Sequence, residues 1–132
     1  MKSKFVVCLI LLFLSLFFGC KKESPLPILE TKVATVFGIS AISGGTIITR
    51  KSAAIQELGV CWSTNKGPGI KDTRTMEDRF SSSYVSIMEG LTPETEYYYR
   101  AYAISSEGVA YGNTLKLKTK ADSSSFLQTD SI

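Results

Sequence analysis

The chain contains no histidine among its 132 residues. This excludes Ser-His-Asp and Cys-His nucleophile activation, histidine-ligated zinc and imidazole proton transfer. The serines are not set in a Gly-x-Ser-x-Gly nucleophile elbow, and the glycine-rich stretch Thr64–Gly69 lacks the following helix that a phosphate-binding loop needs. These absences predict a non-catalytic protein with no cofactor and no metal site.

A strong excess of one charge sign is also missing. The chain has 15 basic and 12 acidic residues, and two of the basic ones, Lys2 and Lys4, lie in an apolar leader. A protein that binds nucleic acid by neutralising phosphates needs a larger basic excess, so nucleic acid is not an expected partner. Asp72, Glu77 and Asp78 do not have the spacing of an EF-hand loop, and we interpret them as solvated loop charges.

Only one long hydrophobic run is present, and it lies at the N-terminus. Of the 14 residues Phe5–Phe18, 13 are apolar, and two lysines precede them. As a helix this run would be about 21 Å long, which is short of the ~30 Å hydrocarbon core of a bilayer. It is therefore predicted to be a secretory signal, and the protein is expected to be exported.

The segment Leu16-Phe-Phe-Gly-Cys20 at the end of the leader resembles the signal of bacterial lipoproteins, in which the cysteine is acylated and becomes the first residue of the mature chain. The resemblance implies a signal peptide over residues 1–19 and lipid attachment at Cys20, which would anchor the protein to a membrane. The alternative is an ordinary cleaved signal with an unrelated cysteine. Since no aspartate follows Cys20, the resemblance also implies the outer membrane or cell surface of a Gram-negative bacterium.

Composition divides the mature chain into three parts. Residues 20–30 contain two prolines and are interpreted as a lipid-attached tether, and the serine-rich residues 121–132 as a disordered tail. Residues 31–120 consist of short β-branched and aromatic runs separated by turn-forming residues, which predicts one all-β domain, an antiparallel sandwich of six to seven strands. The predicted strands are Lys32–Phe37, Ala41–Thr49, Gln56–Ser63, Ser83–Gly90, Thr95–Ser105 and Val109–Thr119, with a weaker one at Ile70–Thr75.

Alternation along these strands assigns their side chains to two faces. Leu58, Val60 and Trp62 share one side and are predicted to lie in the core. The other residues predicted to point inward are Tyr84, Met88, Tyr97, Tyr99, Ala101, Ala103, Leu115 and Leu117. The residues predicted to point outward include Glu57, Cys61, Tyr98, Arg100, Tyr102, Lys116 and Lys118.

Leu91, Pro93, Thr95 and Tyr97 have the spacing of the signature of fibronectin type III domains, which this segment resembles. With Leu58-Gly-Val-Cys-Trp-Ser-Thr64, Tyr97-Tyr-Tyr-Arg-Ala-Tyr-Ala103 and Ala110-Tyr-Gly-Asn-Thr114, the chain is similar to a bacterial subgroup of these modules that occurs in exported and surface proteins. The resemblance covers about residues 31–120 and implies an immunoglobulin-like sandwich of fibronectin type III type. It also implies a tyrosine corner, in which the Tyr97 hydroxyl bonds to backbone upstream, Leu91 caps the core and Pro93 stiffens the turn.

The candidate interaction face consists of Tyr98, Arg100, Tyr102, Lys116 and Lys118. Tyrosine and arginine are enriched at binding hot spots, so this face predicts a protein or glycan partner at the cell surface. Alternatively, these side chains pair across strands and stabilise an exposed sheet without any ligand. In that case the domain is a passive spacer or envelope component.

Three smaller features have two interpretations each. Cys61 has no partner once the leader is removed and Cys20 is acylated, so it is either buried or used in an intermolecular bridge. Gly44 and Gly45 mark either a β-bulge, which we favour, or the close approach of a partner's backbone. Asp130-Ser131-Ile132 resembles a bacterial O-glycosylation acceptor, although so short a pattern also arises by chance.

Overall fold

The computed structural model describes residues 25–50 and 54–121, so the predicted signal peptide, Cys20 and nearly all of the predicted tail lie outside the described residues. Within these ranges all regular structure is β, and no helix is long and apolar enough to cross a membrane. The strands are β1 (Ile28–Thr31), β2 (Thr35–Phe37), β3 (Ser40–Thr49), β4 (Ile55–Ser63), β5 (Thr73–Arg74), β6 (Ser83–Met88), β7 (Glu96–Ser105), β8 (Gly108–Tyr111) and β9 (Leu115–Lys118).

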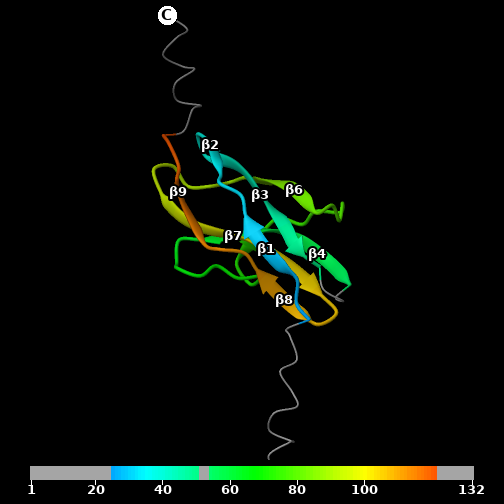
Figure 1. Ribbon diagram of the computed structural model, residues 1–132. Helices are drawn as coiled ribbons and strands as arrows, with labels where there is room; N and C mark the ends of the chain where they lie inside the picture. Colours follow the sequence, from blue (N-terminus) through cyan, green and yellow to red (C-terminus); the bar gives the residue numbers. More distant parts are fainter. Residues whose placement is uncertain (1–24, 51–53, 122–132) are drawn as a thin grey trace, which may run out of the picture.

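The strands form two antiparallel sheets (Figure 1). In the first sheet β3 is central, with β1 and β2 along one edge and β6 along the other. In the second, the order is β5, β4 and β7, and β8 and β9 share the far edge of β7. Because β1 with β2, and β8 with β9, each share one edge, the strands fill seven positions, which confirms the predicted all-β sandwich of six to seven strands.

The predicted tether and two predicted strands are wrong in their extent. Where one strand was predicted at Lys32–Phe37, the structure has β1 ending at Thr31 and β2 beginning at Thr35. The chain already pairs with β3 at Ile28, and both Pro27 and Leu29 are buried, so the domain begins inside the segment 20–30 that was predicted to be tether. The predicted strand Val109–Thr119 is interrupted at Gly112. There the Gly112 N–H donates to the Ala101 carbonyl (2.8 Å), and an added Cβ would lie 2.6 Å from the Thr31 hydroxyl oxygen. The close crossing of β1 therefore divides this strand in two.

Two clusters of buried side chains form the core between the sheets. One contains Trp62, Val60, Met88 and Tyr99, and the other contains Leu58 and Tyr84. The predicted inward face is confirmed for all of these residues, since none is more than 7% exposed. Both clusters are drawn from residues 29–117, with Leu26 packed against one of them. Both core clusters of the described residues therefore lie in the chain after the leader.

The tyrosine corner is formed as the resemblance implies. The Tyr97 hydroxyl accepts a hydrogen bond of 2.8 Å from the Thr92 N–H, and Leu91 is buried in the core. Pro93 is exposed in the turn between them. This bond closes the connection from the first sheet to β7.

The glycine pair in β3 does not form a bulge, which corrects the favoured interpretation. Pairing of β3 with β6 continues through Gly44 and Gly45 without a shift in register. A Cβ on Gly44 would lie 2.0 Å from the Tyr84 carbonyl oxygen, and one on Gly45 would lie 2.5 Å from the Tyr84 hydroxyl. The glycines are therefore required by the close approach of this chain's own β6.

Candidate functional site

The outward side of the β4–β7 pair, where most of the candidate interaction face was predicted, is covered by the chain between β4 and β6. The Thr75 N–H donates to the Val60 carbonyl (2.9 Å), and the Glu77 N–H donates to the Leu58 carbonyl (2.8 Å). Pro68, in the same connection, is fully buried. Residues 58–62 are consequently buried on both sides of β4, and this face is not an open sheet.

Tyr102 is the clearest correction to the predicted face. It lies on the outward side, as alternation predicts, but it is completely buried rather than exposed. Its hydroxyl is within hydrogen-bonding distance of the Glu57 carboxylate (2.6 Å) and of the Thr75 carbonyl. Gly59 makes room for this contact, because a Cβ there would lie 2.4 Å from the Thr75 oxygen. Tyr102 therefore holds the covering segment and is not available to a partner.

Glu57 connects Tyr102 to the covering segment. Its carboxylate also pairs with Arg74, with 2.8 Å between the Arg74 Nε and the carboxylate oxygen. Partial burial raises the pKa of Glu57, but the hydrogen bonds from Tyr102 and Arg74 lower it more, so the pKa lies below its ordinary value. Burial also raises the pKa of Tyr102, which keeps its hydroxyl protonated and able to donate. The Glu57 carboxylate therefore stays ionised and holds the loop through Arg74 and Tyr102, and it does not act as a proton donor.

Arg100 is also engaged within the domain. Its Nε donates to the Pro68 carbonyl (2.6 Å), and its guanidinium carbon lies 3.8 Å from the centroid of the Tyr111 ring. The Tyr111 hydroxyl accepts a bond of 3.1 Å from the Ile70 N–H. Arg100 and Tyr111 together fix the connection around Pro68, so the expectation of a free, exposed arginine is wrong.

Cys61 lies beneath the same connection. It is fully buried, and its Sγ lies 3.6 Å from the Pro68 carbonyl oxygen and 3.6 Å from the Arg100 carbonyl oxygen. Burial raises the pKa of its thiol to about 11. Because the thiolate is the reactive form, Cys61 is inert at neutral pH while the loop is closed. Of the two interpretations of this cysteine, burial is confirmed.

The part of the predicted face that stays accessible consists of Tyr98, Lys116 and Lys118, which we call the β9 face. Tyr98 is half-buried and both lysines are exposed. The Lys116 ammonium lies 5.8 Å from the Tyr98 ring centroid and 3.9 Å from the Glu96 carboxylate. Exposed pairs of this kind contribute about 1 kcal/mol or less to stability, so the domain does not depend on them to fold.

Two of the acidic residues predicted to be solvated take part in the loop structure. Asp72 accepts a bond of 2.8 Å from the Gly69 N–H, and Glu77 accepts one of 2.8 Å from the Ser86 hydroxyl. Among residues 25–50 and 54–121, no group of three or more acidic or cysteine side chains is placed to hold a metal ion.

The structure also has a surface that the sequence interpretation passed over, on the outer side of the first sheet. Its large apolar side chains are 38–57% exposed and are Phe37, Ile42, Ile48, Val85 and Ile87. A signal for them was available, because the alternation that puts Tyr84 and Met88 inside puts Val85 and Ile87 outside. We call these five residues the apolar face.

Comparison with known proteins identifies the fold. No family model matches the chain, and no curated protein matches it. Among solved structures, it is similar to the sixth fibronectin type III domain of human fibronectin type III domain containing protein 3, with a TM-score of 0.54 and 19% identity over 79% of this chain and 94% of that one. A fibronectin type III domain of human fibronectin type III domain containing protein 3 matches with a TM-score of 0.51 and 17% identity over 80% of this chain and 94% of that one.

The fold is therefore an immunoglobulin-like sandwich of fibronectin type III type, as predicted. At these identities the similarity establishes the fold and does not identify a ligand.

Proposed function

We propose that this protein is an exported lipoprotein, anchored through Cys20 to the outer membrane of a Gram-negative bacterium, and that its domain is a non-catalytic binding or assembly module. The sequence of the leader, with Cys20 directly after the apolar run, carries the anchoring part of the proposal. The fold supports the second part, since a sandwich of this type presents side chains on rigid strands. Its partner would be a protein or glycan at the cell surface.

Replacing Cys20 with alanine is expected to abolish incorporation of labelled palmitate and to yield unprocessed or soluble protein. The reason is that multiple acyl chains anchor a protein stably, and no helix within the described residues could replace them. Metabolic labelling followed by fractionation measures both effects. Cys61→Ala is the matched control and should keep its label, because Cys61 is buried in the sandwich. Labelling that persists in Cys20→Ala contradicts the anchor.

The β9 face is the surface through which a partner would be bound, and the double variant Tyr98→Ser with Lys116→Ser tests it. We expect crosslinking and pull-down from intact cells to lose the partner, while the melting midpoint stays close to that of the unmodified protein. The stability should change little, because exposed charge pairs contribute about 1 kcal/mol or less. Glu107→Ser is the control, because it removes an exposed charge from the turn between β7 and β8, at the other end of β7 from Tyr98.

The alternative function is a passive spacer or envelope component. It is favoured by one observation: Arg100 and Tyr102, the two residues best suited to a hot spot, are engaged by the chain's own loop. Recovery of the same crosslinked proteins with and without the double variant would exclude binding through the β9 face and leave the spacer.

A further inference from the structure

The outer side of the first sheet carries the apolar face along its length. Ile42 on β3 lies directly opposite Ile87 on β6, and Val85 lies opposite Gly44. Phe37 on β2 pairs with Ser40 and therefore points to the same side as Ile42. Edge strands are commonly protected by charge or proline, but residues 81–88, which include β6, contain neither. One charged group lies within the face, since the Lys32 ammonium donates to the Tyr84 carbonyl (3.1 Å) next to Gly44. The face is thus an apolar surface with one cation that is already engaged by the backbone.

The size of the apolar face argues against a stable dimer through this surface alone. Five large apolar side chains, each about half exposed, present on the order of 500 Å² of surface, in the range of functional patches on monomers. A stable protein interface buries about 800 Å² on each partner. A tethered domain can bind a lipid surface with a smaller buried area, because the tether already holds it beside the lipid and binding is then intramolecular.

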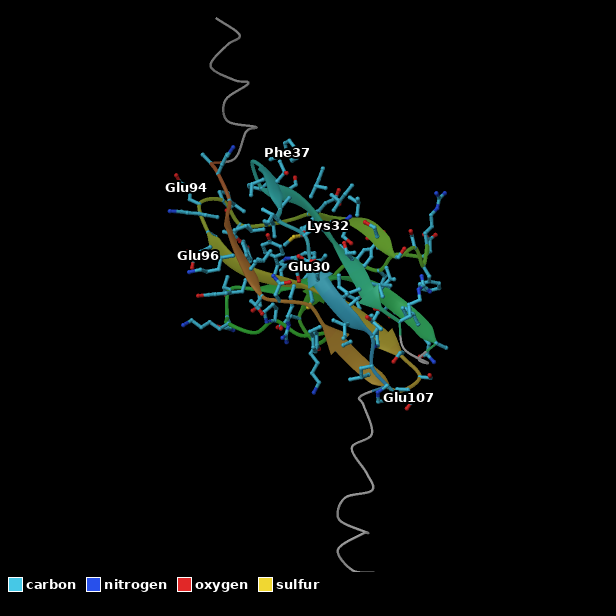
Figure 2. All side chains as sticks on the ribbon, viewed as in Figure 1. Glu30, Lys32, Phe37, Glu94, Glu96 and Glu107 are labelled. Atoms are coloured by element: carbon cyan, nitrogen blue, oxygen red, sulfur yellow. The ribbon has the colours of Figure 1, made fainter. Side chains whose placement is uncertain are left out.

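The tether brings the apolar face close to the lipid. From Cys20 to Pro27, the first buried residue, the chain reaches about 24 Å when fully extended. β3, which carries the middle of the face, is itself about 33 Å long. Ile28 pairs with Thr49 beside Ile48, so the tether enters at one end of the face. Phe37 lies at the other end of the apolar face. Figure 2 shows Phe37 and Glu107 at opposite ends of the domain.

We propose that the apolar face lies against the headgroup and acyl-chain boundary of the membrane to which Cys20 anchors the chain. This rests on the proposed anchor and adds an orientation to it. The second sheet then faces away from the lipid and presents the β9 face to a partner. Charges of both signs lie on or beside the apolar face. Lys32 and Arg50 are bonded to the backbone carbonyls of Tyr84 and Phe80, while Glu30 lies opposite Thr46 and Glu89 follows β6. The contact is therefore apolar and should not depend on anionic lipid or on salt.

An anchor that replaces the acyl chains separates this proposal from the lipoprotein claim. The probe is residues 21–132 with six histidines in place of Cys20. The histidines hold the protein on nickel-chelating lipid in vesicles of three parts phosphatidylethanolamine to one part phosphatidylglycerol. A nitrobenzoxadiazole fluorophore is attached through Ile87→Cys on the apolar face or Lys118→Cys on the β9 face. Cys61 stays unlabelled because its thiol is buried and its pKa is about 11.

We expect blue-shifted emission at position 87 and loss of intensity when the acyl chains carry a spin label, with neither effect at position 118. Adding Ile42→Glu opposite position 87 should abolish both effects, whereas Met76→Glu, an equally drastic change at a side chain that is 68% exposed on another surface, should not. Thermal melts check that each variant is folded.

Three results would overturn the proposal. Emission typical of water at both positions would show that the domain stands away from the lipid. A shift at position 87 that appears without vesicles and grows with protein concentration would place a second copy on the face. A salt-sensitive shift at position 118 would place the basic β9 face on the membrane. None of these results bears on Cys20, whose acylation is tested by palmitate labelling.

Discussion

Replacing Trp62 with alanine is expected to lower the free energy of unfolding by about 3 to 5 kcal/mol, the usual cost of truncating a large aromatic side chain in a packed core. Trp62 is 7% exposed and packs in the same cluster as Val60 and Tyr99. The surrounding strands are paired on both sides, so the cavity cannot collapse easily.

Denaturant melts of residues 21–132, which contain both core clusters, measure this change. Val33→Ala is the control, because Val33 is 83% exposed and its truncation should change stability by about 0.5 kcal/mol or less. A cost below about 1 kcal/mol for Trp62→Ala would show that this side chain is not part of the core.

Trp62 also shows why the sheet faces could be predicted from sequence. The alternation in Leu58-Gly-Val-Cys-Trp62 allows only one register that keeps the tryptophan out of water. The tyrosine corner was predictable for a similar reason, since Leu91, Pro93 and Tyr97 have a fixed local spacing. In both cases the information lies within a few residues of chain.

The covering of the second sheet was not predictable in this way. The bond between Arg100 and Pro68 joins residues 32 positions apart, and the bond between Tyr102 and Glu57 joins residues 45 positions apart. No local pattern in the sequence predicts that a loop folds back over an outward face. Alternation therefore gave the correct direction for Tyr102 and Arg100 but the wrong exposure.

The two faces of the sandwich consequently differ from the prediction in opposite ways. The tyrosine-rich side, predicted to be the accessible one, is largely covered by the connection between β4 and β6. The side with Ile42 and Ile87, on which no function was predicted, is open. In the proposed lipid-anchored state, the open apolar side would meet the membrane and the partly basic side would meet a partner.

Replacing Tyr102 with alanine is expected to destabilise the domain by about 3 to 5 kcal/mol, although the residue lies on the outward side of its strand. Its ring is fully buried, and its hydroxyl bonds to Glu57 and Thr75. Tyr102→Phe keeps the ring and should cost about 1.5 to 3 kcal/mol, because it removes the hydrogen bond to the charged Glu57 carboxylate. Tyr98→Phe, at a half-buried position on the same strand, is the control and should change stability by about 0.5 kcal/mol or less.

A second measurement distinguishes loss of the loop cover from a general loss of stability. Tyr102 and Cys61 lie under the same connection between β4 and β6, and the thiol is protected only while that connection is closed. In Tyr102→Ala, Cys61 should react with a thiol reagent faster than it does in a core variant of equal stability such as Trp62→Ala. If the two variants react at the same rate, Tyr102 contributes to the core in general and does not hold the cover.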